Sequence, residues 1–210
     1  MVSSFVGAVQ FLAKGGPVMV PLLVASMAAA AVAIERAIVL GRAGRDSEPL
    51  MESVRRLVRQ DAFADAVRAC EEAGTPVGRM LAAGLRARGL PPDRLEKVLQ
   101  EQALAELPEL NRRMVVLDTV ITVAPLLGLL GTVTGMIRSF DVMALSGVDR
   151  PHAITGGVAE ALIATAAGLA IAIATLVVYN ALSERVRQIT AQLETRATQL
   201  ENLLAEVSVR

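Results

Sequence analysis

The chain has 210 residues, of which 53% are apolar, 20% are charged and only 2% are aromatic, with no tryptophan. A soluble protein of this length normally has more aromatic side chains in its core, so the composition favours an integral membrane protein. Its 21 basic and 21 acidic residues give a formal net charge of zero, without the basic bias of a nucleic-acid-binding protein. The single cysteine, Cys70, excludes an internal disulfide.

The first long apolar segment follows a weakly apolar N-terminal stretch, residues 1–14. It has no charged residue from Gly15 to Ile34, and its two prolines lie near its start, where proline does least harm to a helix. We therefore expect a first membrane helix over residues 15–36. A cleaved signal peptide is disfavoured, because Lys14 alone precedes the apolar run, which is no basic n-region, and the positive charge is concentrated after the run.

Residues 37–113 form a mixed-charge segment that is rich in alanine and leucine. Glycines at 74 and 89 and the pair Pro91–Pro92 divide this segment into short helical runs. Pro108 is expected to mark a kink or a boundary before the next membrane helix. The pattern predicts a small helical domain.

The second apolar segment contains VAPLLGLLGTVTGMIRSF at residues 123–140. At ~1.5 Å per helical residue, its uncharged run is long enough to cross a hydrocarbon core of ~30 Å, so we expect a membrane helix over residues 114–140. Its small and polar residues recur at helical spacing and share one face: Ala124, Pro125, Gly128, Gly131, Thr132 and Gly135. Lipid tails are as apolar as leucine, so a helix gains little by hiding its leucines from lipid. A face of small residues instead allows another backbone to come close, so this face is expected to lie against protein or a pore. Thr132 either presents its hydroxyl to the interior of an assembly or bonds back to a carbonyl of its own helix.

A third apolar segment spans residues 153–182, after a short loop predicted at 141–152. It carries one charge, Glu160, near its start. A carboxylate inside a bilayer costs roughly 2.5 to 3.5 kcal/mol on insertion scales, so one that persists faces protein or water and often belongs to an ion path. The alternative is a structural role, in which Glu160 reaches the interface or pairs with Arg138 or Arg150.

The third segment also carries a stripe of small residues at i+4 spacing, with Ala164 and Gly168 following Glu160. Thr165 lies about 140° from Glu160 around the helix, so the two side chains cannot both point into one narrow channel. One of them is expected to face a neighbouring helix or subunit. Apolar residues continue in steps of three and four beyond the span, which predicts an amphipathic C-terminal helix over residues 183–210.

The basic residues orient the chain. Fourteen of the 21 lie between Arg36 and Arg113, and four lie after Ser183. Because basic loops stay in the cytoplasm, the N-terminus and the loop at 141–152 are predicted on the outer side and the C-terminus inside.

Three stretches resemble the MotA/TolQ/ExbB proton-channel family, nearest its ExbB/TolQ branch. They are GPVMVPLLVASMAAAAVAIERA at residues 16–37, APLLGLLGTVTGMIRSF at 124–140 and GGVAEALIATAAGLAIAIATLVVYN at 156–180. The resemblance implies an all-α integral membrane protein of the bacterial inner membrane, with three transmembrane helices that extend into the cytoplasm as long helices and a small helical cytoplasmic domain. It also implies a homopentamer around a central pore.

In functional terms, the resemblance implies a proton-channel and motor subunit that converts the proton-motive force into mechanical work for envelope transport or integrity. The implied partners are a single-helix membrane protein resembling ExbD or TolR in the pore and an energy transducer resembling TonB or TolA. By motif position, Thr132 and Thr165 line the pore and face the partner's aspartate, and Glu160 is the acidic residue of the third helix. The residues assigned to helix shape and packing are Pro125, Gly128, Gly131, Gly135, Ala164 and Gly168. Some family members have tryptophan in place of Thr134 and proline in place of Ala174.

Other classes of function fit less well. A passive oligomeric scaffold without ion coupling is the main alternative, because small residues also serve packing alone. A solute transporter would normally have more helices and a visible inverted repeat. An enzyme is least favoured, since one histidine (His152), one cysteine and no phosphate-binding glycine loop leave little catalytic equipment. We expect no catalytic residue, metal site or cofactor.

Overall fold

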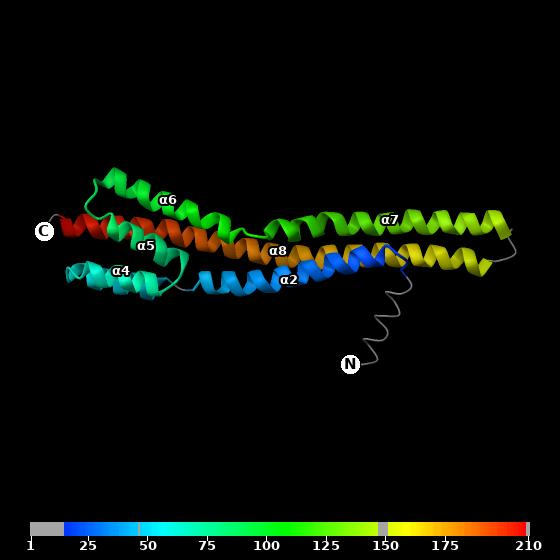
Figure 1. The fold of residues 1–210 in the computed structure, drawn as a ribbon, viewed down its shortest axis with the longest axis horizontal. Coiled ribbons are helices and arrows are strands. Elements are labelled where there is room, and N and C mark those ends of the chain that lie inside the picture. The colour runs from blue at the N-terminus through cyan, green and yellow to red at the C-terminus, as the bar shows by residue number, and fades with distance from the viewer. Residues whose placement is uncertain (1–14, 46, 147–150, 209–210) are drawn as a thin grey trace, which may run out of the picture. The chain divides into compact units, whose positions relative to one another are not determined.

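The computed structural model describes residues 15–45, 47–146 and 151–208, and all regular structure in them is helical (Figure 1). The helices are α2 (Met19–Ala43), α3 (Glu48–Arg59), α4 (Phe63–Glu72), α5 (Pro76–Arg86), α6 (Pro92–Leu110), α7 (Met114–Ser146) and α8 (Pro151–Ser208). The predicted all-α class is confirmed for this part of the chain. The predicted outer segment 1–14, Arg150 and the last two residues lie outside the described residues.

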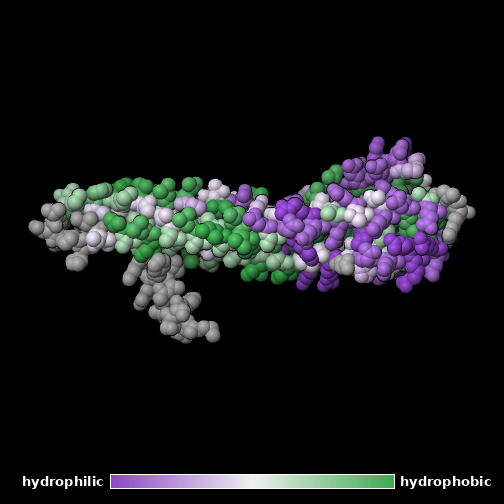
Figure 2. All heavy atoms as spheres, turned by 180° about the vertical axis from the view of Figure 1, so that it is seen from behind, coloured by the Kyte–Doolittle hydropathy of each residue, from purple (hydrophilic) through white to green (hydrophobic). Residues whose placement is uncertain are grey.

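The contacts divide the chain into two units. We call Met1–Ile34 with Arg113–Asn180 the apolar unit, and Glu35–Arg112 with Ala181–Arg210 the charged unit. The long helices α2 and α8 each contribute to both. In Figure 2, hydrophobic residues cover most of the apolar unit, and hydrophilic residues gather on the charged unit.

Three helices of the described residues, α2, α7 and α8, are long and apolar enough to cross a membrane, which confirms the expected three spans. In the apolar unit the large apolar side chains point outward, among them Met27, Leu126, Leu129, Leu162 and Ile173. The buried residues of α7 and α8 include alanines such as Ala124, Ala161 and Ala164. This arrangement is the reverse of a soluble protein and suits a lipid environment, because lipid tails accept leucine as readily as a protein core does.

The charged unit has an ordinary apolar core, formed by α3, α4, α5 and α6 around the end of α8. Its fully buried members include Met51, Val54, Leu81, Leu85, Leu99 and Leu200. Thr75 caps α5, because its Oγ1 accepts a hydrogen bond from the Gly78 backbone N–H at 3.1 Å. The buried side chain of Arg36 donates to the Glu109 carbonyl at 3.0 Å, at the end of α6, where the Arg112 N–H also donates to the same oxygen at 3.3 Å.

Several helices are longer than the sequence pattern predicts. Pro108 lies inside α6, which ends two residues later at Leu110. α7 continues to Ser146 and α8 begins at Pro151, so part of the segment 141–152 that we expected as a loop is helical. Apolar and small residues with good helix propensity, such as Met143 and Ala144, explain the extension of α7 beyond its apolar span.

Candidate functional site

Helices α7 and α8 lie side by side in the apolar unit (Figure 1), and glycines bring their backbones close together. A Cβ atom added to Gly131 would lie 2.5 Å from the Cβ of Ala164. One added to Gly135 would lie 2.8 Å from the Cβ of Ala161, and one added to Gly128 would lie 2.9 Å from the Cα of Thr165. The small face of α7 therefore packs against α8 of the same chain.

The facing surface of α8 is equally tight. A Cβ atom added to Gly168 would overlap the carbonyl oxygen of Ala124, which is backbone and cannot rotate away. A Cβ atom added to Gly157 would overlap the hydroxyl of Ser139, which is buried and donates to the Gly135 carbonyl at 3.0 Å. Pro125 lies within α7 one residue after the buried Ala124, and its side chain is half-buried. We did not single out Gly157 and Ser139 from the sequence, although both continue the small-residue pattern.

The hydroxyl of Thr165 connects the two helices. Its Oγ1 donates to the carbonyl oxygen of Gly128 on α7 at 2.8 Å, and the side chain is half-buried. A hydroxyl has one proton to donate and can still accept hydrogen bonds through its lone pairs. Thr165 therefore holds α7 and α8 together and keeps an oxygen acceptor for a further group.

Thr132 bonds within its own helix. Its Oγ1 donates to the Leu129 carbonyl at 2.6 Å, three residues earlier, and the side chain is half-buried. The local bond is of the back-bonding type that threonines make in membrane helices. Like Thr165, Thr132 has its proton engaged and its lone pairs available.

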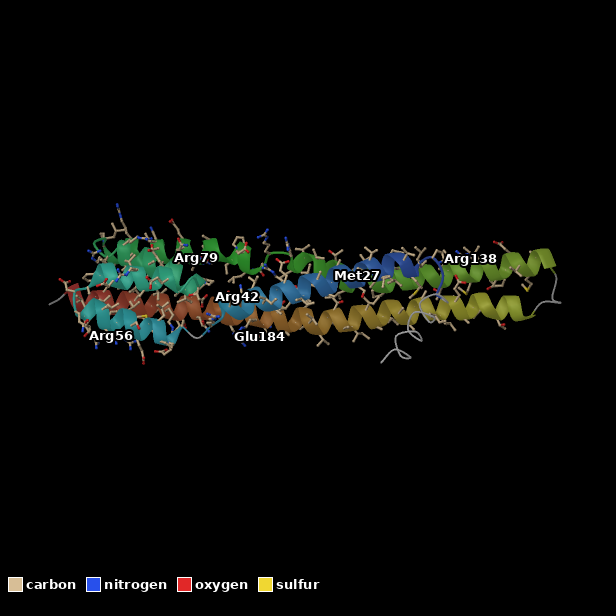
Figure 3. The ribbon with its side chains drawn as sticks, turned by 60° about the horizontal axis from the view of Figure 1, so that its bottom comes forward. Met27, Arg42, Arg56, Arg79, Arg138 and Glu184 are labelled. Carbon is tan, nitrogen blue, oxygen red and sulfur yellow. The ribbon has the colours of Figure 1, made fainter. Side chains whose placement is uncertain are left out.

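Glu160 lies where three segments of the apolar unit meet. Arg138 of α7, labelled in Figure 3, donates through Nη1 to Oε1 of Glu160 at 3.0 Å. Gly16, just before α2, has a φ of +72°, and a Cβ atom there would overlap the same carboxylate oxygen. The side chain of Glu160 is 29% exposed, so it keeps access to the surface of the isolated chain. The contact with Gly16 was not predicted, because it depends on a left-handed backbone turn that no spacing rule reveals.

The described residues offer little for covalent or metal chemistry. No group of three or more His, Cys, Asp or Glu side chains among them could hold a metal ion. In the charged unit, burial raises the pKa of the Cys70 thiol to about 12, so the thiol stays protonated at neutral pH and is a poor nucleophile.

Comparison with known proteins identifies the family. The model of the MotA/TolQ/ExbB proton channel family matches residues 72–195, which is more than half of the chain and includes α7 with most of α8. The chain belongs to the MotA/TolQ/ExbB proton channel family. It is therefore a multi-pass membrane protein of a family of transport components.

Individual relatives place the chain in the ExbB/TolQ branch of this family, as the motifs predict. The biopolymer transport protein ExbB-like 3 of Synechocystis sp. is 36% identical over 189 residues, which cover 89% of this chain and 90% of that protein. ExbB-like 1 of the same organism is 35% identical over 201 residues, or 92% of this chain and 78% of that protein. The Tol-Pal system protein TolQ of Haemophilus influenzae is 46% identical over 86 residues, 40% of this chain and 37% of TolQ.

Proposed function

We propose that this chain is the channel subunit of a bacterial inner-membrane motor that converts the proton-motive force into mechanical work for envelope transport or integrity. The observation that carries the proposal is the similarity, over almost the whole chain, to ExbB-like biopolymer transport proteins. The proton-channel family match and the carboxylate inside the third apolar helix agree with it.

The proposal includes the assembly. Five copies surround a central pore that holds the membrane helix of an ExbD- or TolR-like partner, and a TonB- or TolA-like transducer carries the work onward. The N-terminus lies on the periplasmic side, and the charged unit lies in the cytoplasm. The excess of basic residues between Arg36 and Arg113 supports this orientation.

The two threonines provide the surface on which the partner's carboxyl group moves. Because Thr132 and Thr165 both donate their protons to backbone carbonyls, their oxygens present lone pairs. A protonated carboxylic acid can donate to these oxygens, whereas a carboxylate would require a hydroxyl to turn away from its carbonyl. Protonation also removes a desolvation cost of several kcal/mol from the partner's helix. The membrane potential supplies ~2.3 kcal/mol per proton per 100 mV.

Glu160 has one of two roles in this scheme, in the proton path or in structure. In the path it exchanges protons with water on the outer side and releases Arg138 when it is protonated. In the structural role the ion pair with Arg138 only fixes α7 against α8. The variant Glu160→Gln separates the two, because glutamine keeps a hydrogen-bond acceptor for Arg138 but cannot carry a proton.

Proton flux and envelope work should be measured for Thr132→Val and Thr165→Val in the presence of the partner. We expect both variants to lose coupling, and Thr165→Ser to restore it because serine keeps the hydroxyl. Thr134→Val is the matched control, because Thr134 also bonds back to carbonyls of α7, at 3.0 Å to Leu130. Unchanged coupling in both valine variants would end the proposal.

A passive scaffold makes the opposite predictions. The internal packing of the small residues of α7 against α8 is compatible with it. In that case Glu160→Gln would leave the physiological output intact, and an uncoupler of the membrane potential would not affect it.

A further inference from the structure

A groove between α6 and α8 in the charged unit has an apolar floor and an acidic rim. Its volume is about 310 Å³, and its floor includes Leu99, Leu193 and Leu104, of which Leu104 is 56% exposed. Its rim carries Glu96 from α6 and Glu194 and Glu201 from α8. We call this the acidic groove. An apolar floor beneath carboxylates suits arginine, whose aliphatic stem packs on leucine while its guanidinium binds the carboxylate.

Among the described residues, no cation neutralises the acidic groove. No basic side chain lines it, and none of its three rim carboxylates forms an ion pair with another described residue. Burial, and secondly the charge of Glu96, raise the pKa of Glu201 above its ordinary value. Two carboxylates therefore repel each other at one end of the groove, and an added cation would relieve that repulsion.

The charged unit also carries a surface of opposite charge, on α3. Arg55, Arg56 and Arg59 lie together on it, next to Glu52, and we call these three arginines the basic face. Arg59 pairs with Glu206 of its own chain, but Arg55 and Arg56 have no ion-pair partner among the described residues. In Figure 3, Arg56 lies on the opposite side of the charged unit from α6. One chain therefore cannot bring its own basic face into its own acidic groove.

Two ion pairs fix the height of α3 along α8. Arg196 of α8 pairs with Glu48 at the start of α3 at 2.7 Å, and Glu206 of α8 pairs with Arg59 at its end at 3.3 Å. The helices therefore run parallel, and at ~1.5 Å per residue in both, residues 55–56 lie level with about residues 202–203 of α8. Glu201 and its neighbour Glu96 lie within one turn of that level.

The shared level of the basic face and of the Glu96–Glu201 end of the groove indicates a second copy of this chain as the occupant. Copies inserted into one bilayer in the same orientation are related by rotation about the membrane normal, which leaves the depth of every residue unchanged. For a rotation axis parallel to the end of α8, the basic face of one copy therefore meets a neighbour at the level of the Glu96–Glu201 end of its groove. A contact between two different surfaces is heterologous, and it closes into a ring when the rotation between neighbouring copies divides a full turn.

We propose that the acidic groove receives the basic face of α3 from a second copy of this chain, so that Arg55 and Arg56 of one copy pair with Glu201 and Glu96 of the next. The inference rests on the homo-oligomer of the proposed function and names the surfaces that join its copies. Each copy contributes one groove and one face, and all copies of a closed ring are thereby saturated.

Cysteine cross-linking of the full-length protein tests the pairing. Glu52, beside the basic face, and Thr198, in the groove, are both surface positions at nearly the same level along α8. We expect membranes that contain both Glu52→Cys and Thr198→Cys chains to give cross-linked dimers with a short bis-maleimide, and either variant alone to give none. The double variant should give a ladder whose highest band reports the number of copies. Chains with Cys70 alone measure the background, which should be low because Cys70 is buried.

Charge reversal tests the ion pairs. Arg55→Glu with Arg56→Glu should lower the cross-linking yield about tenfold, as for the loss of a close charge pair, and adding Glu96→Arg with Glu201→Arg should restore it. Arg68→Glu is the control, because Arg68 is an exposed arginine of α4 whose partners, Asp65 and Glu72, belong to the same helix. Its yield should equal that of the parent.

Several results would overturn the inference. Cross-linking by one single-cysteine variant alone would mean a symmetric contact, and cross-linking of Thr198→Cys to another protein would mean that the groove has a different occupant. An intact oligomer that couples protons but gives no mixed cross-link would reject these surfaces and leave the proposed function in place. An oligomer that cross-links normally but does not couple protons would reject the proposed function and leave these surfaces in place.

Discussion

The apolar unit and the charged unit use the same kinds of residues in opposite ways. In the charged unit, leucines such as Leu81, Leu99 and Leu200 are buried, because water drives apolar surface together. In the apolar unit, leucines such as Leu126 and Leu129 are exposed, and glycine and alanine form the contact between α7 and α8. Side-chain volume therefore stabilises one unit, and close backbone approach stabilises the other.

Polar groups follow the same division. In the apolar unit the hydroxyls of Thr132, Thr165 and Ser139 donate to backbone carbonyls, which satisfies them without a charge. In the charged unit, ion pairs join different helices, such as Arg79 of α5 with Glu106 of α6. Glu160 and Arg138 nevertheless form an ion pair inside the apolar unit, and this is one reason why we assign Glu160 a place in the candidate site.

The largest expected effect comes from removing the same volume in both units. Leu200→Ala should lower the free energy of unfolding by about 2–5 kcal/mol, because it opens a cavity in a fully buried core. Leu129→Ala should cost well under ~1 kcal/mol, because the leucine is more than half exposed and lipid fills the space. Thermal and denaturant unfolding in detergent would measure both. Equal losses would contradict the division between the units.

The reverse change, added volume, should harm the apolar unit. Gly168→Ala should destabilise by about 1–3 kcal/mol, because the new Cβ meets the backbone carbonyl of Ala124. Gly156→Ala is the matched control on the same helix, since nothing lies within 4 Å of its Cβ position. The control should be neutral or gain up to ~1 kcal/mol from helix propensity. A loss in Gly156→Ala as large as in Gly168→Ala would show that the close approach is not the cause.

Breaking the ion pair between α5 and α6 should lower the free energy of unfolding more when Arg79 is replaced than when Glu106 is replaced. Arg79→Ala leaves the buried carboxylate of Glu106 without its cation, and we expect a loss of about 1–3 kcal/mol. Glu106→Gln should cost less, because Arg79 is 47% exposed and can turn to water, while Gln102 remains beside position 106. The same unfolding measurement compares them, and a greater loss in Glu106→Gln would refute the asymmetry.

Sequence periodicity gives much of the architecture and of the candidate site. The i, i+3, i+7 spacing of Gly128, Gly131 and Gly135 identifies a close-packing face, because it depends only on helix geometry. Periodicity does not say what that face packs against, and the structure shows that the contact lies within one chain. Gly16 is different: its contact with Glu160 joins residues 144 positions apart through a left-handed turn, which no local pattern encodes.

The ends of helices were less predictable for a related reason. We ended the second membrane helix near Phe140, at the end of the apolar run, but helix formation does not stop where hydrophobicity does, and α7 continues to Ser146. Pro108 was expected to mark a kink or a boundary, and it lies inside α6, which ends two residues later at Leu110. The carbonyl of Glu109 at the end of α6 accepts a hydrogen bond from Arg36, a residue 73 positions away, as well as one from the nearby Arg112 N–H.

The smallest expected effect concerns the acidic groove and separates an isolated chain from an assembled one. The pKa of Glu201 is raised in the folded chain, so Glu201 loses its proton at a lower pH in the unfolded chain than in the folded one. The free energy of unfolding therefore falls as the pH rises from the unfolded pKa to the folded pKa. In detergent at a dilution that gives single copies, Glu201→Gln should therefore gain a few tenths of a kcal/mol at pH 7, because the side chain is partly exposed and screened. The gain should vanish at a pH below the ordinary pKa of glutamate, where the carboxyl group is neutral in both the folded and the unfolded chain.

If the neighbouring copy supplies Arg55 and Arg56, the same variant should weaken the assembled protein at pH 7. A gain in both states would mean that no cation reaches the groove.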